Sequence, residues 1–263
     1  MYNFISDAEK KISIEFETKG YIIKKIPKKF FNEIEKEFVN FIKKKLKIKK
    51  NYNNSFLLNN FHKFLKSDDL NKFRVNLISH INKSFRFKKN FFLSAKPYLE
   101  LLVGNELMMQ NNISLSIQLP KDDSSLLPIH SDVWSGDSPF EVVVWMPLVN
   151  CSKTKSMYLL PPSKYKKIEK KFKSLLSKDS EIIFEKIKKN VKWINIKRGE
   201  ILLFNQSLPH GNRVNLENET RWSMNCRFKS IFSPYGDKKL GEFFQPITLK
   251  KVSELAMNYK LPE

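Results

Sequence analysis

The sequence predicts a mainly β protein with flanking helices, whose core is an antiparallel sandwich or jelly roll. Two observations lead to this fold class. Residues 1–110 carry helical patterns, whereas residues 111–232 carry short apolar stretches of period two separated by turn residues. The 263 residues hold 41% hydrophobic residues and 22 phenylalanines, which suffice for one substantial core. Since no Gly/Ser linker or internal repeat divides the chain, we expect residues 1–263 to form a single domain.

The first 110 residues are expected to form a helix-rich support for that core. The stretch ISIEFETKGYIIKKI (12–26) alternates about Gly20, and we interpret it as a short strand. Two later stretches have apolar residues three and four positions apart, which predicts amphipathic helices. Their apolar positions are Phe31, Ile34, Phe38, Phe41, Ile42 and Leu46 in the first, and Leu70, Phe73, Leu77 and Ile81 in the second.

The jelly-roll core is expected over residues 111–232. Its predicted strands lie in NISLSIQLP (112–120), FEVVVWMPL (140–148), SMYLLPP (156–162), VKWINIKRGEILLFNQS (191–207, two strands about Gly199) and TRWSMNCRFKSIF (220–232). A helical insertion at 163–190 interrupts them. A C-terminal helical segment within 233–263 follows Pro246, with Thr248 as its N-cap. Either helical stretch is consistent with simple packing, and the last one also with a lid over a site.

The formal charge of +21 is consistent with binding to nucleic acid or to an anionic surface. However, only six of the 48 basic residues are arginines, the side chain that base and phosphate readers favour. The excess of Lys, Asn, Ile and Phe is typical of an AT-rich genome. We therefore disfavour nucleic acid as a partner. The positive electrostatic field of the protein would attract a negatively charged small substrate equally well.

The sequence also indicates the compartment. No stretch approaches the roughly 18 apolar residues that a membrane span needs. The N-terminus shows no signal-peptide pattern. Two cysteines, Cys151 and Cys226, make no disulfide framework and fit a reducing environment. We expect a cytoplasmic protein without a membrane span; its oligomeric state cannot be read from the sequence.

Three residues of the β half have the types that bind a metal ion. In an extended segment His130 and Asp132 point to the same side, so that an imidazole nitrogen and a carboxylate oxygen converge. His210 follows another apolar strand. Two imidazoles and one carboxylate on one face of an ion form the facial triad of non-haem Fe(II) oxygenases. The alternative is a structural histidine, which is how we interpret His62 and His80.

The stretch TRWSMNCRF (220–228) separates polar from apolar residues by alternation. One predicted face holds Arg221, Ser223, Asn225 and Arg227, and the other holds Trp222, Met224, Cys226 and Phe228. If the polar face points inward, an arginine there needs an anionic partner, which a dicarboxylate co-substrate supplies. The alternative is an edge strand with a solvated polar face.

With these motifs the sequence resembles the iron(II)/2-oxoglutarate-dependent oxygenase superfamily: H-x-D at 130–132, the later His210, and R-x-S at 221–223. FETKGYIIKKI and VVVWMPLVN…KSMYLLPPSK are similar to its phytanoyl-CoA dioxygenase-like branch. HSDVWSGDSPFEVVVWMPLVNC resembles a bacterial subset found with surface-carbohydrate gene clusters. The resemblance covers roughly residues 10–232. Residues 161–164 read Pro-Pro-Ser-Lys where that branch has Pro-Gly-Ser-His, a departure at the pocket rim.

The resemblance implies a double-stranded β-helix (jelly roll, cupin-like) core and an Fe(II) ion held by His130, Asp132 and His210. It implies 2-oxoglutarate as co-substrate, bound by Arg221 and Ser223, and O2 as oxidant. Strand-face parity adds Gln118 and Ser156 as lesser co-substrate contacts. Because halogenating members lack the carboxylate at the position of Asp132, its presence indicates hydroxylation or a related oxidation. We also expect Arg221→Ala to raise the 2-oxoglutarate requirement far more than Arg74→Ala.

The substrate is expected to be a small molecule, and the resemblance suggests a carbohydrate or sugar nucleotide of surface polysaccharide biosynthesis. Trp134 and Asp137 follow the metal acid, and an aromatic ring beside a carboxylate suits a sugar. The alternative, held equal, is that Trp134 packs the mouth of the barrel and Asp137 caps a turn. Asn212, Arg213 and Asn215 follow His210 and contact substrate or tie down their loop. Two alternatives stay open: the same mechanism on an amino acid, lipid or secondary metabolite, and a non-enzymatic basic β-domain that binds nucleic acid or anionic glycan.

Overall fold

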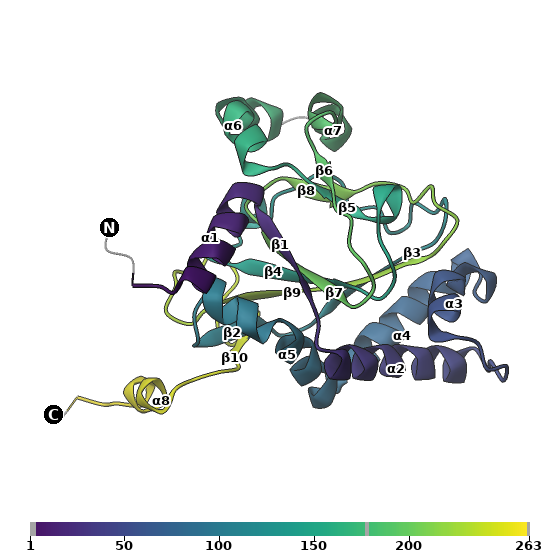
Figure 1. Cartoon of the computed structure of the whole chain (residues 1–263), viewed down its shortest axis with the longest axis horizontal. Coiled ribbons are helices and arrows are strands. Elements are labelled where there is room, and N and C mark those ends of the chain that lie inside the picture. Colours follow the sequence, from purple (N-terminus) through teal and green to yellow (C-terminus); the bar gives the residue numbers. More distant parts are fainter. Residues whose placement is uncertain (1–3, 177–178, 262–263) are drawn as a thin grey trace.

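Two antiparallel sheets form the centre of the molecule, and helices lie outside them (Figure 1). The computed structural model describes residues 4–176 and 179–261, without the side chains of 170–176. Its strands are β1 (Tyr21–Lys25), β2 (Leu107–Gln110), β3 (Ser114–Gln118), β4 (Val142–Pro147), β5 (Met157–Leu159), β6 (Lys192–Trp193), β7 (Glu200–Asn205), β8 (His210–Asn212), β9 (Arg221–Ser230) and β10 (Phe244–Pro246). Its α-helices are α1 (Asp7–Lys19), α2 (Lys28–Lys45), α3 (Asn54–Asn59), α4 (Leu70–Lys83), α5 (Phe85–Leu102), α6 (Pro162–Leu176), α7 (Ser180–Ile187) and α8 (Lys251–Met257).

The larger sheet is built around β9, which pairs with β2, β3 and β4. β7 lies beyond β4, β1 lies beyond β7, and β10 flanks β2. β4 has the sequence VVVWMP and is buried along its whole length, as expected for a strand covered on both faces. The predictions of helices near 28–46 and 70–81 and of strands within 112–120, 140–148, 156–162 and 220–232 are confirmed.

The smaller sheet has the order β6-β5-β8. It faces the larger one, because residues of β5 and β8 line the same cavity as residues of β3, β4, β7 and β9. The two strands predicted about Gly199 exist, but β6 belongs to the smaller sheet and β7 to the larger. The chain thus crosses from one sheet to the other within 191–207.

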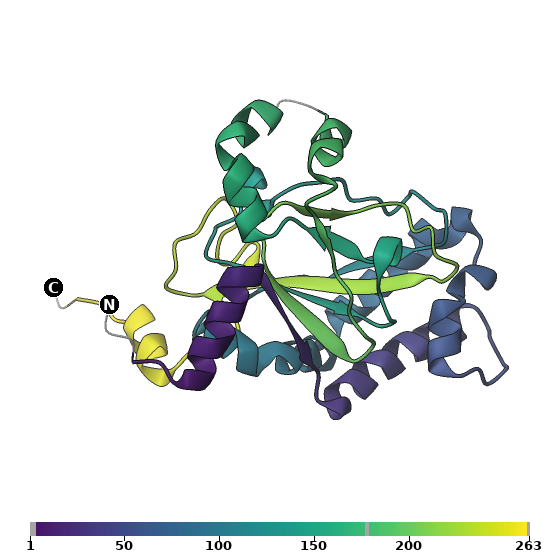
Figure 2. The same ribbon diagram turned by 45° about the horizontal axis from the view of Figure 1, so that its top comes forward.

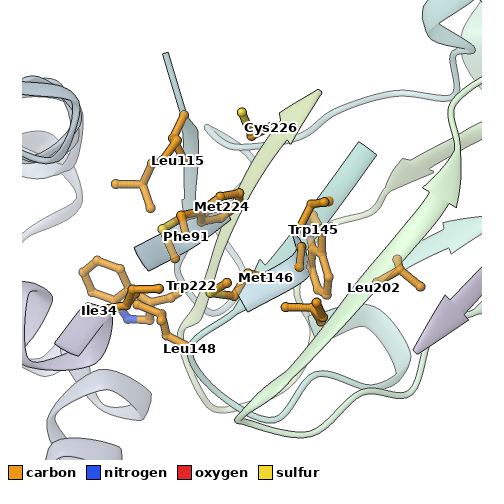
Figure 3. Close-up of a cluster of buried hydrophobic side chains, with 14 of the residues drawn as sticks. Ile34, Phe91, Leu115, Trp145, Met146, Leu148, Leu202, Trp222, Met224 and Cys226 are labelled. Atoms are coloured by element: carbon orange, nitrogen blue, oxygen red, sulfur yellow. The ribbon is translucent and has the colours of Figure 1, made fainter. Parts of the chain in front are cut away.

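The predicted alternation along β9 is confirmed, and it separates the cavity from the core. Trp222, Met224, Cys226 and Phe228 are fully buried, whereas the alternate residues line the cavity. Trp222 packs edge-on against Phe38, Phe61 and Phe73 of the N-terminal helical region, and its Nε1 donates to the Leu58 carbonyl at 2.9 Å. Figure 3 shows Phe91 and Trp222 on the helical side of β9 and Trp145 on the other side. The helices therefore support the sheet from outside the cavity.

The segment 12–19 was predicted to be part of a strand, and that prediction is wrong. It lies in α1, and the strand there, β1, comprises only Tyr21–Lys25. The cause is local: Ser6 and Glu9 form a capping box that starts the helix. Gly20 ends it at a φ of 80°, a left-handed conformation that glycine adopts without strain.

The two helical stretches of the second half also differ from their predicted form. The insertion at 163–190 contains two helices, α6 and α7, which lie above the smaller sheet (Figure 1). Thr248 is not the N-cap of α8: its hydroxyl accepts from the Leu107 amide at 2.9 Å and donates to the Asn105 carbonyl, whereas Lys250 occupies the cap. Figure 1 shows α8 at the opposite side of the molecule from β5, β6 and β8, and it buries none of its residues; Figure 2 shows it again at the outer edge. In this position α8 does not cover the smaller sheet.

The antiparallel sheets with flanking helices are as predicted, but the prediction of a mainly β protein is wrong, because the described helices hold more residues than the strands. The excess arises because the N-terminal support is almost entirely helical. Among the described helices, none combines the length and the apolarity needed to cross a lipid bilayer.

Candidate metal centre

The two candidate histidines are brought together by the backbone. His130 and His210 form an isolated antiparallel bridge in which each amide donates to the other carbonyl, at 2.9 and 2.8 Å. Ser131 is extended, with φ −126° and ψ 135°, so His130 and Asp132 lie on the same side of the chain. The Ser131 hydroxyl points the other way and donates to the carbonyls of Gln206 and Ser207. The predicted convergence within H-x-D is therefore present.

The donor atoms of His130, Asp132 and His210 face one another. The Asp132 Oδ1 atom lies 3.4 Å from Nε2 of His130 and 4.0 Å from Nε2 of His210. One ligand atom from each residue lies within 4.8 Å of the other two, and this is the one such group in the described part of the chain. Each histidine Nδ1 lies 2.8–2.9 Å from a backbone carbonyl, of Pro128 or Leu208. Because a carbonyl only accepts, Nδ1 carries the proton and Nε2 keeps its lone pair toward the cluster.

The surroundings hold these groups in the protonation states that metal ligands need. Burial raises the pKa of Asp132, but the adjacent His130 ring and the charges of His210 and Arg227 outweigh burial and lower it to about 2. Burial, reinforced by the charge of His130, lowers the pKa of His210 to about 4. Near pH 7 the cluster thus offers a carboxylate and a neutral imidazole at these two positions.

Asp132 has a second partner that sequence reasoning missed. Arg227 Nη2 lies 2.9 Å from Asp132 Oδ2, the oxygen that does not face the histidines. Arg227 Nε also donates to Gln206 Oε1 at 3.1 Å, and the Gln206 amide donates to buried Glu141 at 2.9 Å. A chain of polar contacts therefore fixes the orientation of the carboxylate. The alternation of β9 had placed Arg227 on the inner face, but nothing in the sequence paired it with Asp132.

A cavity of about 270 Å³ adjoins the three residues, between the two sheets. Its apolar walls include Val143, Trp145, Met157 and Phe204. Its polar lining consists of Arg74, Ser116, Ser125, His130, Asp132, His210, Asn212, Arg221, Ser223, Asn225 and Arg227. A small volume with apolar walls and a few convergent polar groups is typical of a site for a small molecule.

Arg221 is buried in this cavity without a carboxylate partner in the described residues. Its exposed fraction is 2%, its Nη2 donates to Ser116 Oγ at 2.8 Å, and its Nε is buried without a partner. Burial lowers the pKa of Arg221 to about 10, so it is still a cation near pH 7. Ser223 is buried beside it on the same face of β9 and lines the same cavity. A buried cation of this kind is stable only with an anion, which the cavity has room to hold.

Gln118 and Ser156 lie outside the cavity lining. The Gln118 amide donates to the Arg213 carbonyl at 2.7 Å, and Gln118 sits opposite Arg221 in the β3–β9 register. Gln118 Oε1 and Ser156 Oγ are both buried without a hydrogen-bond partner. Neither side chain lines the space that adjoins the metal ligands.

Trp134 and Asp137 are near the metal ligands in sequence, yet neither lines the cavity. Trp134 packs against the apolar cluster of Ile129, Tyr158, Leu160, Ile183, Phe184 and Ile187. Asp137 is buried, with its Oδ1 3.7 Å from Arg227 Nε, and burial raises its pKa. For Trp134 the packing agrees with the structural interpretation rather than with a sugar platform.

The side chains of Asn212, Arg213 and Asn215 are all engaged by other parts of the protein. Asn212 lines the cavity, but its side chain accepts from the Leu127 amide and donates to the Ser125 carbonyl. Arg213 lies outside the lining, stacked on Phe184 of α7 and paired with Glu181. Asn215 donates to the Glu219 carbonyl at 2.8 Å.

The two remaining histidines are outside the cluster, as predicted. His62 Nδ1 contacts Thr220 Oγ1 at 3.0 Å, and His80 pairs with Glu37. The sequence had placed Asn225 and Arg227 on the inward polar face of β9, but it missed Arg74, Ser116 and Ser125 as parts of the lining. Parity along β3 was a usable signal for Ser116. No sequence pattern indicated Arg74, because it lies on a helix that is far from the β half in the sequence.

Comparisons with known proteins support the fold. No family model matches the sequence, and no curated protein matches it. Among solved structures, the nickel complex of the non-heme monooxygenase ThoJ has a TM-score of 0.50 at 13% identity, covering 94% of this chain and 93% of that chain. Its apo form has a TM-score of 0.51 at 12% identity, covering 91% and 84%. EvdMO1 reaches 0.55 at 12% identity, over 85% of this chain and 50% of that one. At such identities the likeness shows a shared fold.

Proposed function

We propose that the chain is a non-haem Fe(II)- and 2-oxoglutarate-dependent oxygenase. One observation carries the proposal: a single cavity joins a His-Asp-His donor set to a buried arginine that has no carboxylate partner among the described residues. Two imidazoles and one carboxylate fit Fe(II) and leave further coordination positions open. The two facing antiparallel sheets support the double-stranded β-helix core that such an enzyme has, built as a single domain.

In this function His130 and His210 bind the ion through Nε2 and Asp132 through Oδ1. Fe(II) and 2-oxoglutarate, when bound, supply the oxidation of a substrate C–H bond by O2. Arg227 holds Asp132 Oδ2, so the carboxylate presents a single oxygen to the ion. Arg221 and Ser223 would bind the far carboxylate of 2-oxoglutarate, and Val143, Trp145, Met157 and Phe204 would form the apolar part of the wall around it. The presence of Asp132 as third ligand supports hydroxylation or a related oxidation.

The finer assignments rest on the sequence resemblance. It supports the phytanoyl-CoA dioxygenase-like branch and a carbohydrate or sugar nucleotide of surface polysaccharide biosynthesis as substrate. The proposed cytoplasmic location has a different support: Cys151 and Cys226 are both free thiols, which fits a reducing compartment. Trp134 and Asp137 add no support for a sugar, because they lie outside the cavity lining. The small volume of the cavity favours a small molecule over nucleic acid. The same mechanism on an amino acid, lipid or secondary metabolite is the second candidate.

The proposal is tested by an anaerobic titration of the wild-type protein with Fe(II) and then with 2-oxoglutarate. The expected result is a visible charge-transfer band that saturates at one equivalent of each. Protein that develops no band and binds neither component by calorimetry would contradict the proposal. In that case a steep loss of oligonucleotide binding with rising salt would indicate the basic nucleic-acid-binding alternative.

Arg227→Gln should weaken metal binding without removing a ligand. Asp132 then loses the cation that orients its outer oxygen, and loss of such an outer partner typically costs about 10- to 100-fold in metal affinity. The measurement is competition with a chelator for Fe(II) or Ni(II). Arg198→Gln is the matched control, because Arg198 also pairs with a buried carboxylate, Glu35, but outside the cavity. Equal metal affinities in Arg227→Gln and Arg198→Gln would show that Arg227 does not position the ligand.

A further inference from the structure

The six arginines of the chain divide into two groups. Four have a carboxylate within ion-pair distance: Arg86, Arg198, Arg213 and Arg227. In the described part of the chain the other two, Arg74 and Arg221, have none, and both line the cavity beside the metal ligands. The two arginines without a carboxylate partner in this part of the chain therefore both line the cavity that adjoins the metal ligands.

Arg74 reaches the cavity from α4, a helix of the N-terminal support. Both of its hydrogen bonds come from Nη2, to the Ile117 carbonyl at 3.3 Å and to Ser125 Oγ at 2.5 Å. Its Nε is buried without a partner. Burial lowers the pKa of Arg74, and the charge of Asp122 opposes that effect. The guanidinium is thus anchored at one corner, and its charge is not neutralised by a contact with an acid.

Arg74 and Arg221 approach the cavity from different directions. Arg221 lies on β9 and donates to the side chain of Ser116, on the neighbouring strand β3. Arg74 instead donates to the backbone carbonyl of Ile117 and to the hydroxyl of Ser125. Ser125 lies in the loop that leads to His130. The acid that lines the cavity, Asp132, already pairs with Arg227. Neither Arg74 nor Arg221 is within ion-pair distance of the Asp132 carboxylate.

2-Oxoglutarate has two carboxylates, and the cavity has two arginines without a carboxylate partner among the described residues. Under the proposed function, 2-oxoglutarate places one carboxylate at the metal and the other at Arg221, which leaves Arg74 without an anion. We propose that Arg74, held in place by Ser125, binds an anionic group of the substrate, a carboxylate or a phosphate. This inference rests on the proposed function and adds a substrate class to it: small molecules that carry an oxyanion. Arginine suits this role because its planar donors pair with two oxygens at once.

The test uses the N–H signals of the arginine Nε atoms in the full-length protein. With six arginines, a ¹⁵N–¹H spectrum has few such signals, and the Arg74→Gln variant identifies that of Arg74. The protein is loaded with Zn(II), a diamagnetic replacement for Fe(II), and with saturating 2-oxoglutarate. Inorganic phosphate and acetate are then titrated separately as probes. We expect at least one of them to shift the Arg74 signal to saturation, while the Arg86 signal stays in place.

The probe that binds more tightly identifies the group: acetate indicates a carboxylate, and phosphate a phosphate ester. Arg74→Gln should weaken binding of that probe about tenfold or more, as expected for loss of a charge-assisted hydrogen bond, and Arg74→Lys should recover part of it. Arg86→Gln, a change at an exposed arginine, should have no effect. Unchanged Arg198 and Arg213 signals verify that the Arg74 variants are folded.

Two outcomes would overturn the inference while the proposed function stands. In one, neither anion moves the Arg74 signal. In the other, 2-oxoglutarate alone saturates the Arg74 shift and Arg74→Gln weakens 2-oxoglutarate as much as Arg221→Gln does, so that Arg74 holds the co-substrate. Failure of the proposed function has a different signature, because the wild-type protein then binds neither the metal ion nor 2-oxoglutarate.

Discussion

His130→Ala should abolish the charge-transfer band that wild-type protein forms with Fe(II) and 2-oxoglutarate. Loss of an outer partner of a metal ligand costs about 10- to 100-fold in affinity, so loss of a ligand itself should cost more than about 100-fold. His130 is the best ligand to remove, because its side chain is 27% exposed and leaves no buried charge behind. Removal of Asp132 would instead leave Arg227 without its carboxylate in a buried setting.

His62→Ala is the control for this measurement. His62 contacts Thr220 and lies outside the cavity, so its loss should leave the band intact. Thermal unfolding of both variants verifies that each is folded. A band of equal intensity in the two variants would remove His130 from the metal centre and contradict the proposed ligand set.

Arg221→Ala should raise the dissociation constant of 2-oxoglutarate by at least about 30-fold. Truncation of one partner of a buried charge pair costs about 2 kcal/mol or more, and about 1.4 kcal/mol corresponds to tenfold. Metal binding should be unchanged, since Arg221 does not contact the ligands. Calorimetric titration of 2-oxoglutarate into protein loaded with Ni(II) measures the effect without turnover.

Arg86→Ala is the appropriate control for Arg221→Ala, because Arg86 is exposed and pairs with Glu33 on the helical side. The sequence had suggested Arg74 for this purpose, but Arg74 lines the same cavity and is not a neutral site. A 2-oxoglutarate affinity that is equal in Arg221→Ala and Arg86→Ala would mean that the co-substrate binds elsewhere.

Local patterns predicted most of the elements that build the site. The period of two along 220–228 placed Arg221 and Ser223 on the inner face, because successive side chains of a strand point to opposite sides. H-x-D placed His130 and Asp132 on one side for the same reason. The error at 12–19 was also local. A capping box and a left-handed Gly20 select a helix there, although the apolar alternation resembles a strand.

The contacts that complete the site connect residues far apart in the chain. Arg227 pairs with Asp132, Arg74 reaches Ser125 from a helix, and Trp134 packs with residues of 183–187. The spacing of residues along the sequence predicts none of these contacts. Trp134 and Asp137 were placed near the open face of the metal by proximity in sequence, and the turn after Asp132 directs them out of the cavity lining instead.

By itself, the sequence determined which residues are able to bind a metal ion and an anion, and on which face of each strand they lie. Those properties follow from side-chain chemistry and from the two-residue repeat of a strand, and both are local. Only the tertiary structure decided which arginines are neutralised and which face the cavity, because that depends on how two sheets and a helix pack together. The assignment of Arg221 to the co-substrate and the proposal for Arg74 both depend on that packing.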